Sequence, residues 1–383
     1  SNKGIWSIAD DPQANTSLQA GLLYHTLTKT NKKLRLKATI TNFVPAASEH
    51  VELMLVDITN ISNTNIEITA TSAIPIYGRS ADNLRDHRHV TSLLHRIRQD
   101  TYGVIVQPVM SFDERGHKEN QTAYYVFGID ESNHPPAGSF PTVELFFGEG
   151  GNVNRPFAIY QNAAPRIFEP FKLNGKEAMG ALRFKTKQLK PNQTASFGLI
   201  LGIARTKKDI AKTFAQYKTL KALRAARGAN KAFWKNKSSE LTFTTGNHAY
   251  DNWLRWVGLQ PRLRKIFGCS FLPDFDYGRG GKGWRDLWQD CLTLLLINPQ
   301  KIRHLIKANF CGVRIDGTNA TIITKTPGVF LSDRNKISRV WMDHGVWPYF
   351  AVELYTNQTG DNQVSRFYLS PDVLGVSRDH AQF

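Results

Sequence analysis

The chain has 383 residues, a formal net charge of +17 and 41% hydrophobic residues. At this length two domains are the default expectation, and the absence of a long apolar stretch predicts a protein that does not span a membrane. Cys269, Cys291 and Cys311 lack CxxC spacing, which argues against a disulfide framework or a metal site. We therefore expect reduced thiols and a cytoplasmic location.

The first half of the chain is rich in short β-prone runs. From Leu22 to about Ala204 these runs are separated by Asn, Pro, Gly and Asp clusters, and few windows have helical spacing. Strands at this spacing are typical of a β-sandwich. Two insertions interrupt the pattern, an Arg- and His-rich stretch at 82–98 and an acidic, glycine-rich stretch at 144–154. The expected strands are Leu34–Ile40, Val51–Ile58, Ile66–Ile76, Gly103–Val109, Thr122–Phe127 and Thr194–Ile203.

A basic segment follows the β-rich half. Between Leu201 and Glu240 there are eleven Lys or Arg residues and two acids. Apolar residues from Ile210 to Leu223 recur at helical spacing, so most of these cations should line the solvated face of a helix. The segment is interpreted as a basic connecting helix. Nucleic-acid binding is an alternative that rests on net charge alone, because the chain has no zinc-finger spacing and no RNA-binding signature.

Helices joined by long loops make up the last part of the chain. Trp253, Trp256 and further apolar residues recur at helical spacing, and an Asn-Pro pair supplies an N-cap and a first-turn proline for another helix. The expected helices are Tyr250–Phe267, Trp284–Ile297, one from Pro299 to about Phe310, and one from Val346 or Trp347 to before Gly360.

Two motif-rich segments lie in this helical part. Residues 279–290 read RGGKGWRDLWQD, and residues 333–348 read DRNKISRVWMDHGVWP. Aromatic faces stack on sugar rings, Arg and Asp side chains recognise hydroxyls, and one carboxylic acid can protonate a glycosidic oxygen. The two segments together predict a sugar-handling site.

The same two segments resemble the inverting glycoside phosphorylases of glycoside hydrolase family 94, the cellobiose phosphorylase group. The family pattern of Gly-aromatic-Arg-Asp followed by Gln-Asp is matched at 283–286 and 289–290. A Trp-x-Asp followed by a second Trp four residues after the acid is matched by Trp341, Asp343 and Trp347. The longer sequence segments that read YGRGGKGWRDLWQD, GVRIDGTNATII and DRNKISRVWMDHGVWP are most similar to the 1,2-β-oligoglucan phosphorylase subgroup.

The resemblance implies a β-supersandwich, a helical linker and an (α/α)6 barrel in that order. The expected boundaries are a β-sandwich at 1–204, a basic helical linker at 205–240 and the first part of the barrel at 241–383. A twelve-helix barrel needs on the order of 350 residues. We therefore expect a fragment, with an incomplete barrel and a sandwich that lacks its N-terminal part.

The resemblance also implies roles for individual residues and a reaction. A β-linked glucan, with β-1,2 linkages favoured by the subgroup resemblance, would react with inorganic phosphate to give α-glucose 1-phosphate and a shortened glucan, with inversion. Phosphate would be the co-substrate, and no cofactor would be needed. The alternative is a non-catalytic carbohydrate-binding or assembly fragment; a homodimer or a partner chain completing the barrel is also expected. The implied site residues are Asp343 as general acid, Trp341, Arg285 and Asp286 at the sugar whose anomeric carbon is attacked, Arg279 nearby, and Arg339 and His344 as local candidates for phosphate.

Three of these residues also have a structural interpretation. Asp343 could cap the helix that begins a few residues later, and Arg285 with Asp286 could form an ion pair at a helix start. The tryptophans at helical spacing are interpreted as core residues: Trp253, Trp256, Trp284, Trp288 and Trp347. The Asp-His-Arg-His run at 86–89 is interpreted as a solvated loop or interdomain contact, with a metal or phosphate site as the alternative.

Overall fold

The computed structural model describes residues 4–9, 11, 14–78, 92–113, 116–267, 282–313, 319, 322–323, 330–331 and 343–364. The chain divides into two compact units. The first comprises Ser1–Ala81 and Arg85–Lys235, and the second Asp82–Leu84 and Asn236–Phe383. This division places most of the expected 205–240 linker in the same unit as the sandwich.

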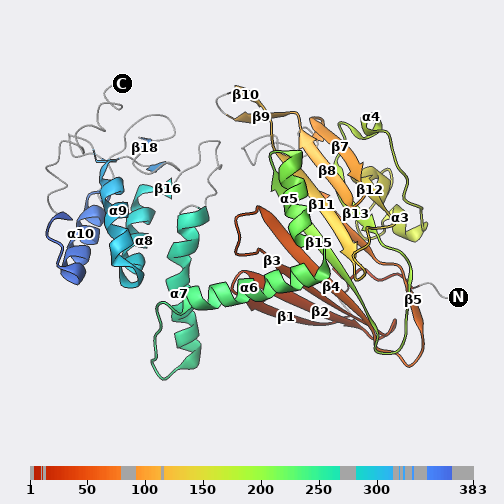
Figure 1. Cartoon of the computed structure of the whole chain (residues 1–383), viewed down its shortest axis with the longest axis horizontal. Coiled ribbons are helices and arrows are strands. Elements are labelled where there is room, and N and C mark those ends of the chain that lie inside the picture. Colours follow the sequence, from red (N-terminus) through yellow and green to blue (C-terminus); the bar gives the residue numbers. More distant parts are fainter. Residues whose placement is uncertain are drawn as a thin grey trace. The chain divides into compact units, whose positions relative to one another are not determined.

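An eight-stranded antiparallel sheet forms the centre of the first unit (Figure 1). Buried and more exposed positions alternate along Leu36–Phe43 and Val51–Asn60, as period-two side-chain placement predicts, whereas Ala123–Asp130 and Thr194–Ala204 are buried at most positions. The outermost strand, β1, is exposed along its whole length. In sheet order the strands are β1 (Asn15–Gly21), β2 (Tyr24–Asn31), β3 (Leu36–Phe43), β4 (Val51–Asn60), β15 (Thr194–Ala204), β11 (Ala123–Asp130), β8 (Gly103–Pro108) and β7 (His95–Asp100).

A three-stranded sheet packs on one face of the large sheet. Its central strand, β13 (Ala178–Arg183), is buried at every position and lies between β12 (Gly138–Thr142) and β6 (Thr71–Ile76). Val126 of the large sheet and Leu182 of β13 belong to the same apolar core. The expected β-sandwich is therefore confirmed. Two further pairs of strands are β5 (Ile66–Ile68) with β14 (Lys187–Leu189), and β9 (Met110–Asp113) with β10 (Gly116–Glu119).

Two expectations for this unit were wrong in detail. The run Ile66–Ile76 is two strands that pair in different sheets, because the chain leaves one sheet for the other between β5 and β6. The end of the Arg- and His-rich insertion is the edge strand β7, in which His95 and Ile97 point inward and Arg96 is exposed. Short helices lie in other expected loops: α2 (Val143–Phe147), α3 (Phe157–Tyr160) and α4 (Pro170–Leu173).

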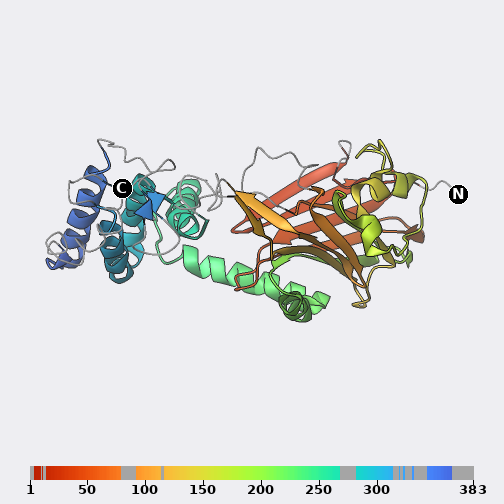
Figure 2. The same ribbon diagram turned by 90° about the horizontal axis from the view of Figure 1, so that it is seen from above.

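Helices α5 (Lys207–Tyr217) and α6 (Leu220–Ser238) cover the other face of the large sheet (Figures 1 and 2). Ile210 of α5 and Leu223 of α6 share an apolar core with sheet residues. Gly198 allows α6 to approach closely, because a Cβ there would lie 2.3 Å from Leu223 Cδ1. Thr206 and Asp209 form a capping box that starts α5.

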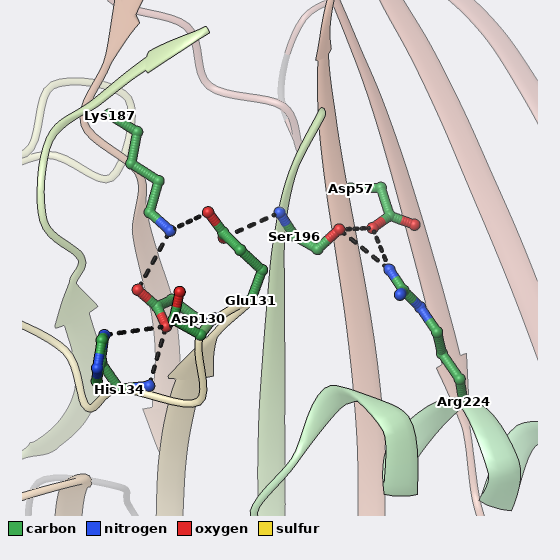
Figure 3. A network of polar contacts seen from close by, with 8 residues as sticks. Asp57, Asp130, Glu131, His134, Lys187, Ser196 and Arg224 are labelled. Atoms are coloured by element: carbon green, nitrogen blue, oxygen red, sulfur yellow. Dashed lines mark hydrogen bonds and ion pairs between the residues drawn. The ribbon is translucent and has the colours of Figure 1, made fainter. Parts of the chain in front are cut away.

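A polar network joins α6 to the sheet (Figure 3). Ser196 Oγ donates to Asp57 Oδ1 at 2.5 Å, and Arg224 Nη2 of α6 donates to Ser196 Oγ at 3.1 Å. Lys187 contacts both Asp130 and Glu131 beside it. The basic helix is thus packed and bonded onto the sandwich along its first half.

The second unit is helical in its described parts. Its helices are α7 (His248–Phe267), α8 (Trp284–Ile297), α9 (Pro299–Phe310) and α10 (Val346–Thr359), with the short strands β16 (Lys282–Gly283), β17 (Ile322–Ile323) and β18 (Phe330–Leu331). As the sequence predicted, Asn298 caps α9 with Pro299 at its first turn, and α10 ends before Gly360. Gly360 adopts the left-handed conformation that favours glycine at a helix end. No helix in the described part of the chain is long and apolar enough to cross a membrane.

Candidate active site

The starts of helices α8 and α10 lie close together in the second unit. The Trp284 indole Nε1, in the first turn of α8, donates to the His344 carbonyl at 3.1 Å. The next residue, Arg285, donates from Nη1 to Asp343 Oδ2 at 2.8 Å. Two adjacent residues of α8 therefore hold the turn that precedes α10.

The burial pattern of α8 explains why Arg285 is available for this contact. Trp284, Trp288, Cys291 and Leu295 recur on one helix face and are almost wholly buried. The two indole rings pack edge to face with centroids 5.6 Å apart. Because this face is anchored in the core, the side chain of Arg285 falls on the rim and is 47% exposed.

Asp343 accepts two side-chain hydrogen bonds on one oxygen. Besides Arg285, the Trp347 indole Nε1 donates to Oδ2 at 3.3 Å. The Trp347 backbone N–H also donates to the Asp343 carbonyl at 3.3 Å. The Asp343 side chain is nevertheless 39% exposed, so solvent or a ligand can reach it.

These contacts set the protonation state of Asp343 in the free protein. The hydrogen bond from Arg285 is the main reason that the pKa of Asp343 lies below its ordinary value, and the indole of Trp347 acts in the same direction. Partial desolvation opposes them without reversing the shift. Asp343 is therefore a carboxylate near neutral pH, able to accept a proton or a hydroxyl hydrogen bond.

Asp343 does not cap α10. The N-cap position is Gly345, and no side chain donates or accepts a capping hydrogen bond there. The carboxylate is instead turned toward Arg285 on α8. The capping interpretation of this residue is thus set aside by the geometry.

Of the predicted site residues other than Arg285 and Asp343, only His344 has a described side chain. His344 is buried, with 8% of its surface exposed, directly after Asp343. Asp286 belongs to α8, but its side chain lies outside the described residues, as do Arg279, Trp341 and Arg339. The 86–89 run also lies outside them. In the part of the chain that the structure describes, no group of three or more His, Cys, Asp or Glu side chains could hold a metal ion.

Two contributors were missed by the sequence reasoning. Trp284 and Trp347 were both interpreted as core residues from their helical spacing. Trp284 is indeed buried, yet its N–H also fixes the turn after Asp343, and Trp347 bonds the carboxylate itself. The signal available in the sequence was the four-residue interval from Asp343 to Trp347, which places two side chains on neighbouring turns.

Comparison with known families identifies the class of this chain. Residues 1–220 match the family model described as glycosyl hydrolase 94, supersandwich domain. The match spans more than half of the chain, which therefore belongs to glycosyl hydrolase family 94. The matched residues lie almost wholly in the sheet-rich first unit, and the Arg285–Asp343 pair lies beyond the matched domain.

Solved structures with low sequence identity were also found. A bacterial glucoamylase complexed with acarbose is 10% identical with a TM-score of 0.45, covering 90% of this chain and 48% of its own. A polysaccharide lyase is 10% identical with a TM-score of 0.28, covering 50% and 23%. A heparinase III is 9% identical with a TM-score of 0.24, covering 51% and 22%. The chain thus spans less than half the length of each, and no curated protein sequence matches it.

Proposed function

We propose that this chain carries the acid–base centre of an inverting glycoside phosphorylase acting on β-linked glucans, with β-1,2-oligoglucans as the first substrates to test. Membership of family 94 supports the enzyme class. The single observation that supports the site is the contact between Arg285, in the first turn of α8, and Asp343, in the turn before α10, with both side chains partly open to solvent.

The pair has the chemistry to bind and protonate a sugar. A guanidinium presents several N–H donors in a fixed fork, and a carboxyl group can accept from a hydroxyl or donate its own proton. In the free protein the Arg285 guanidinium donates a hydrogen bond to the Asp343 carboxylate. A sugar that inserts its hydroxyls between them replaces one ion pair by several hydrogen bonds.

Only one catalytic carboxyl is required for the reaction. A phosphate oxygen attacks the anomeric carbon, the glycosidic C–O bond breaks, and Asp343 gives its proton to the departing oxygen. The products are α-glucose 1-phosphate and a glucan with a new hydroxyl. Phosphate is already an anionic nucleophile, so no second carboxyl is needed to activate it.

The lowered pKa of Asp343 fits one direction of this reaction directly. In synthesis the deprotonated carboxylate accepts the proton of the acceptor hydroxyl. Arg285 keeps Asp343 deprotonated in the free protein by lowering its pKa. For phosphorolysis the sugar must draw Arg285 away so that the pKa of Asp343 rises and the proton is retained. Arg339 and His344 remain proposals for local phosphate contacts, and no cofactor is proposed.

A phosphate-release assay tests the function. Glucose 1-phosphate is supplied with sophorose, laminaribiose or cellobiose as acceptor, and phosphate is measured over time. We expect release with sophorose in preference to the other two. If no β-linked acceptor gives phosphate above the rate of an Asp343→Asn variant, the proposed function is wrong; release with laminaribiose or cellobiose alone would keep the enzyme class and overturn the linkage.

A further inference from the structure

The two oxygens of the Asp343 carboxyl group have different surroundings. Both side-chain donors, Arg285 Nη1 at 2.8 Å and Trp347 Nε1 at 3.3 Å, reach the same oxygen, Oδ2. In the described ranges, no hydrogen bond from another residue's side chain reaches Oδ1. Both described side-chain donors therefore hold Oδ2, and the Asp343 side chain is still 39% exposed.

We propose that Trp347 is a positioning residue whose indole N–H holds Oδ2 of Asp343 as an acceptor, so that Oδ1 is the oxygen that carries the transferred proton. The inference rests on the proposed function, because it assigns a role within the same acid–base step. Nothing in the family match, which ends at residue 220, concerns Trp347.

The location of Trp347 suits it to this task. It lies in the first turn of α10, and it is bonded to Asp343 twice, through the indole to Oδ2 and through its backbone N–H to the carbonyl. Its ring packs against the apolar core of the second unit. The donor is therefore fixed relative to the main chain of the residue it orients, whereas Arg285 reaches in from another helix.

Proton chemistry explains why one oxygen must be reserved. An oxygen that accepts two N–H donors has its lone pairs occupied, so a proton added to the carboxyl group goes to the other oxygen. Protonation at Oδ1 leaves Oδ2 as a carbonyl-like acceptor for both donors. When a sugar hydroxyl takes Arg285, Trp347 still holds Oδ2, and Oδ1 stays directed at the glycosidic oxygen.

The first readout does not depend on turnover. Carboxyl carbons of aspartate are labelled with ¹³C, and Asp343 is titrated by NMR in the wild type and in Trp347→Phe. Of the described residues, Arg285 is the charged group in contact with Asp343, and the adjacent titratable group is the buried His344. Both are unchanged in the variant, so loss of the indole N–H should move the Asp343 titration to higher pH.

The chain offers a matched control in the same unit. Asp361 Oδ2 also accepts from an arginine, Arg303 Nε at 2.7 Å, and from an aromatic residue, the Tyr355 hydroxyl at 3.1 Å. Tyr355→Phe removes that aromatic donor. It should move the titration of Asp361 and leave Asp343 unchanged, whereas Trp347→Phe should do the opposite.

The second readout separates positioning from general damage. On an oligoglucan, Trp347→Phe should lower kcat roughly tenfold, the size expected for one hydrogen bond lost in the transition state, with little change in KM. A dinitrophenyl β-glucoside has a leaving group that needs no proton, so its phosphorolysis should be nearly unaffected. Replacing Trp347 by 3-benzothienylalanine, which keeps the ring shape without the N–H, should reproduce the phenylalanine variant.

The outcomes distinguish this inference from the proposed function. If the wild type turns over the glucan but Trp347→Phe leaves the Asp343 titration and kcat unchanged, the positioning role is wrong while the function stands. Equal losses on the glucan and the activated glucoside, or full activity with benzothienylalanine, also overturn the role. A wild type without turnover on either substrate contradicts the proposed function itself, and with it the catalytic role, whatever the titration shows.

Discussion

Replacing Asp343 by Asn removes a proton while keeping most of the contacts. The amide oxygen of Asn can accept from Arg285 and Trp347 as Oδ2 does, so the arrangement of the two helix starts should persist. The amide cannot give up a proton to a leaving oxygen. General acid catalysis is worth about 10²–10⁴-fold, and we expect a fall of this size in kcat for phosphorolysis of an oligoglucan, with binding of the glucan retained.

The assay compares two substrates and two variants. With a dinitrophenyl β-glucoside the loss in Asp343→Asn should nearly vanish, because that leaving group departs without protonation. The control is Asp361→Asn, the same change at a carboxylate that also lies between an arginine and an aromatic donor, and it should keep full activity. Equal losses on both substrates, or a glucan rate in Asp343→Asn within about threefold of the wild type, would refute the assignment of Asp343 as general acid.

Three predictions concern stability and can be measured by urea or thermal unfolding. Gly198→Ala, in β15, should lower the free energy of unfolding by about 1–3 kcal/mol, because the new Cβ would push α6 away from the sheet. Gly228→Ala, in α6 itself, has no atom within 4 Å of the new Cβ and should raise the free energy of unfolding by about 1 kcal/mol. Glu240→Gln should cost about 1 kcal/mol or less near neutral pH, since the Glu240 pKa, lowered to about 2 chiefly by the hydrogen bond from Arg262, belongs to a partly exposed pair. A carboxyl group whose pKa is lowered by folding stabilises the folded state at pH values above its pKa in the unfolded chain, and this stabilisation is lost as the pH falls toward 2. The free energies of unfolding of the wild type and Glu240→Gln should therefore converge at acid pH. Phe310→Ala should cost about 3–5 kcal/mol, because the ring is 2% exposed in the core of the second unit; a cost below 1 kcal/mol would contradict that packing.

Local patterns in the sequence predict the bounds of individual strands and helices better than they predict which elements pair with one another. The strand expected at Val51–Ile58 is β4, Val51–Asn60, and the helix expected at Trp284–Ile297 is α8 with the same bounds. Periodicity could not divide Ile66–Ile76, since two adjacent strands have the same alternation whether they join one sheet or two. Periodicity also did not predict β7, because the arginines that alternate with the inward-pointing His95 and Ile97 make the segment look like a charged loop.

The candidate site shows the same limit. The residue types and spacing around Arg285 and Asp343 indicated sugar chemistry, but no local pattern gives the contact between residues 58 positions apart. That contact depends on how α8 and α10 pack around Trp284, whose ring is in the core and whose N–H fixes the turn at His344. The role of Trp347 was hidden for a related reason, since an indole can fill a core and donate a hydrogen bond together.

Sharing of Arg285 between Asp343 and a ligand makes sugar binding and protonation interdependent. A sugar that takes Arg285 removes the main cause of the low pKa of Asp343, so the carboxyl group gains affinity for a proton. Linkage requires the reverse as well: protonated Asp343 releases Arg285 and favours the sugar. Glucan affinity, measured by calorimetry without phosphate, should therefore rise as pH falls toward the pKa of Asp343. In Asp343→Asn, where the side chain is neutral throughout, affinity should be nearly independent of pH over the same range. A wild-type affinity that is constant or falls with decreasing pH would show that Arg285 does not leave Asp343 for the sugar.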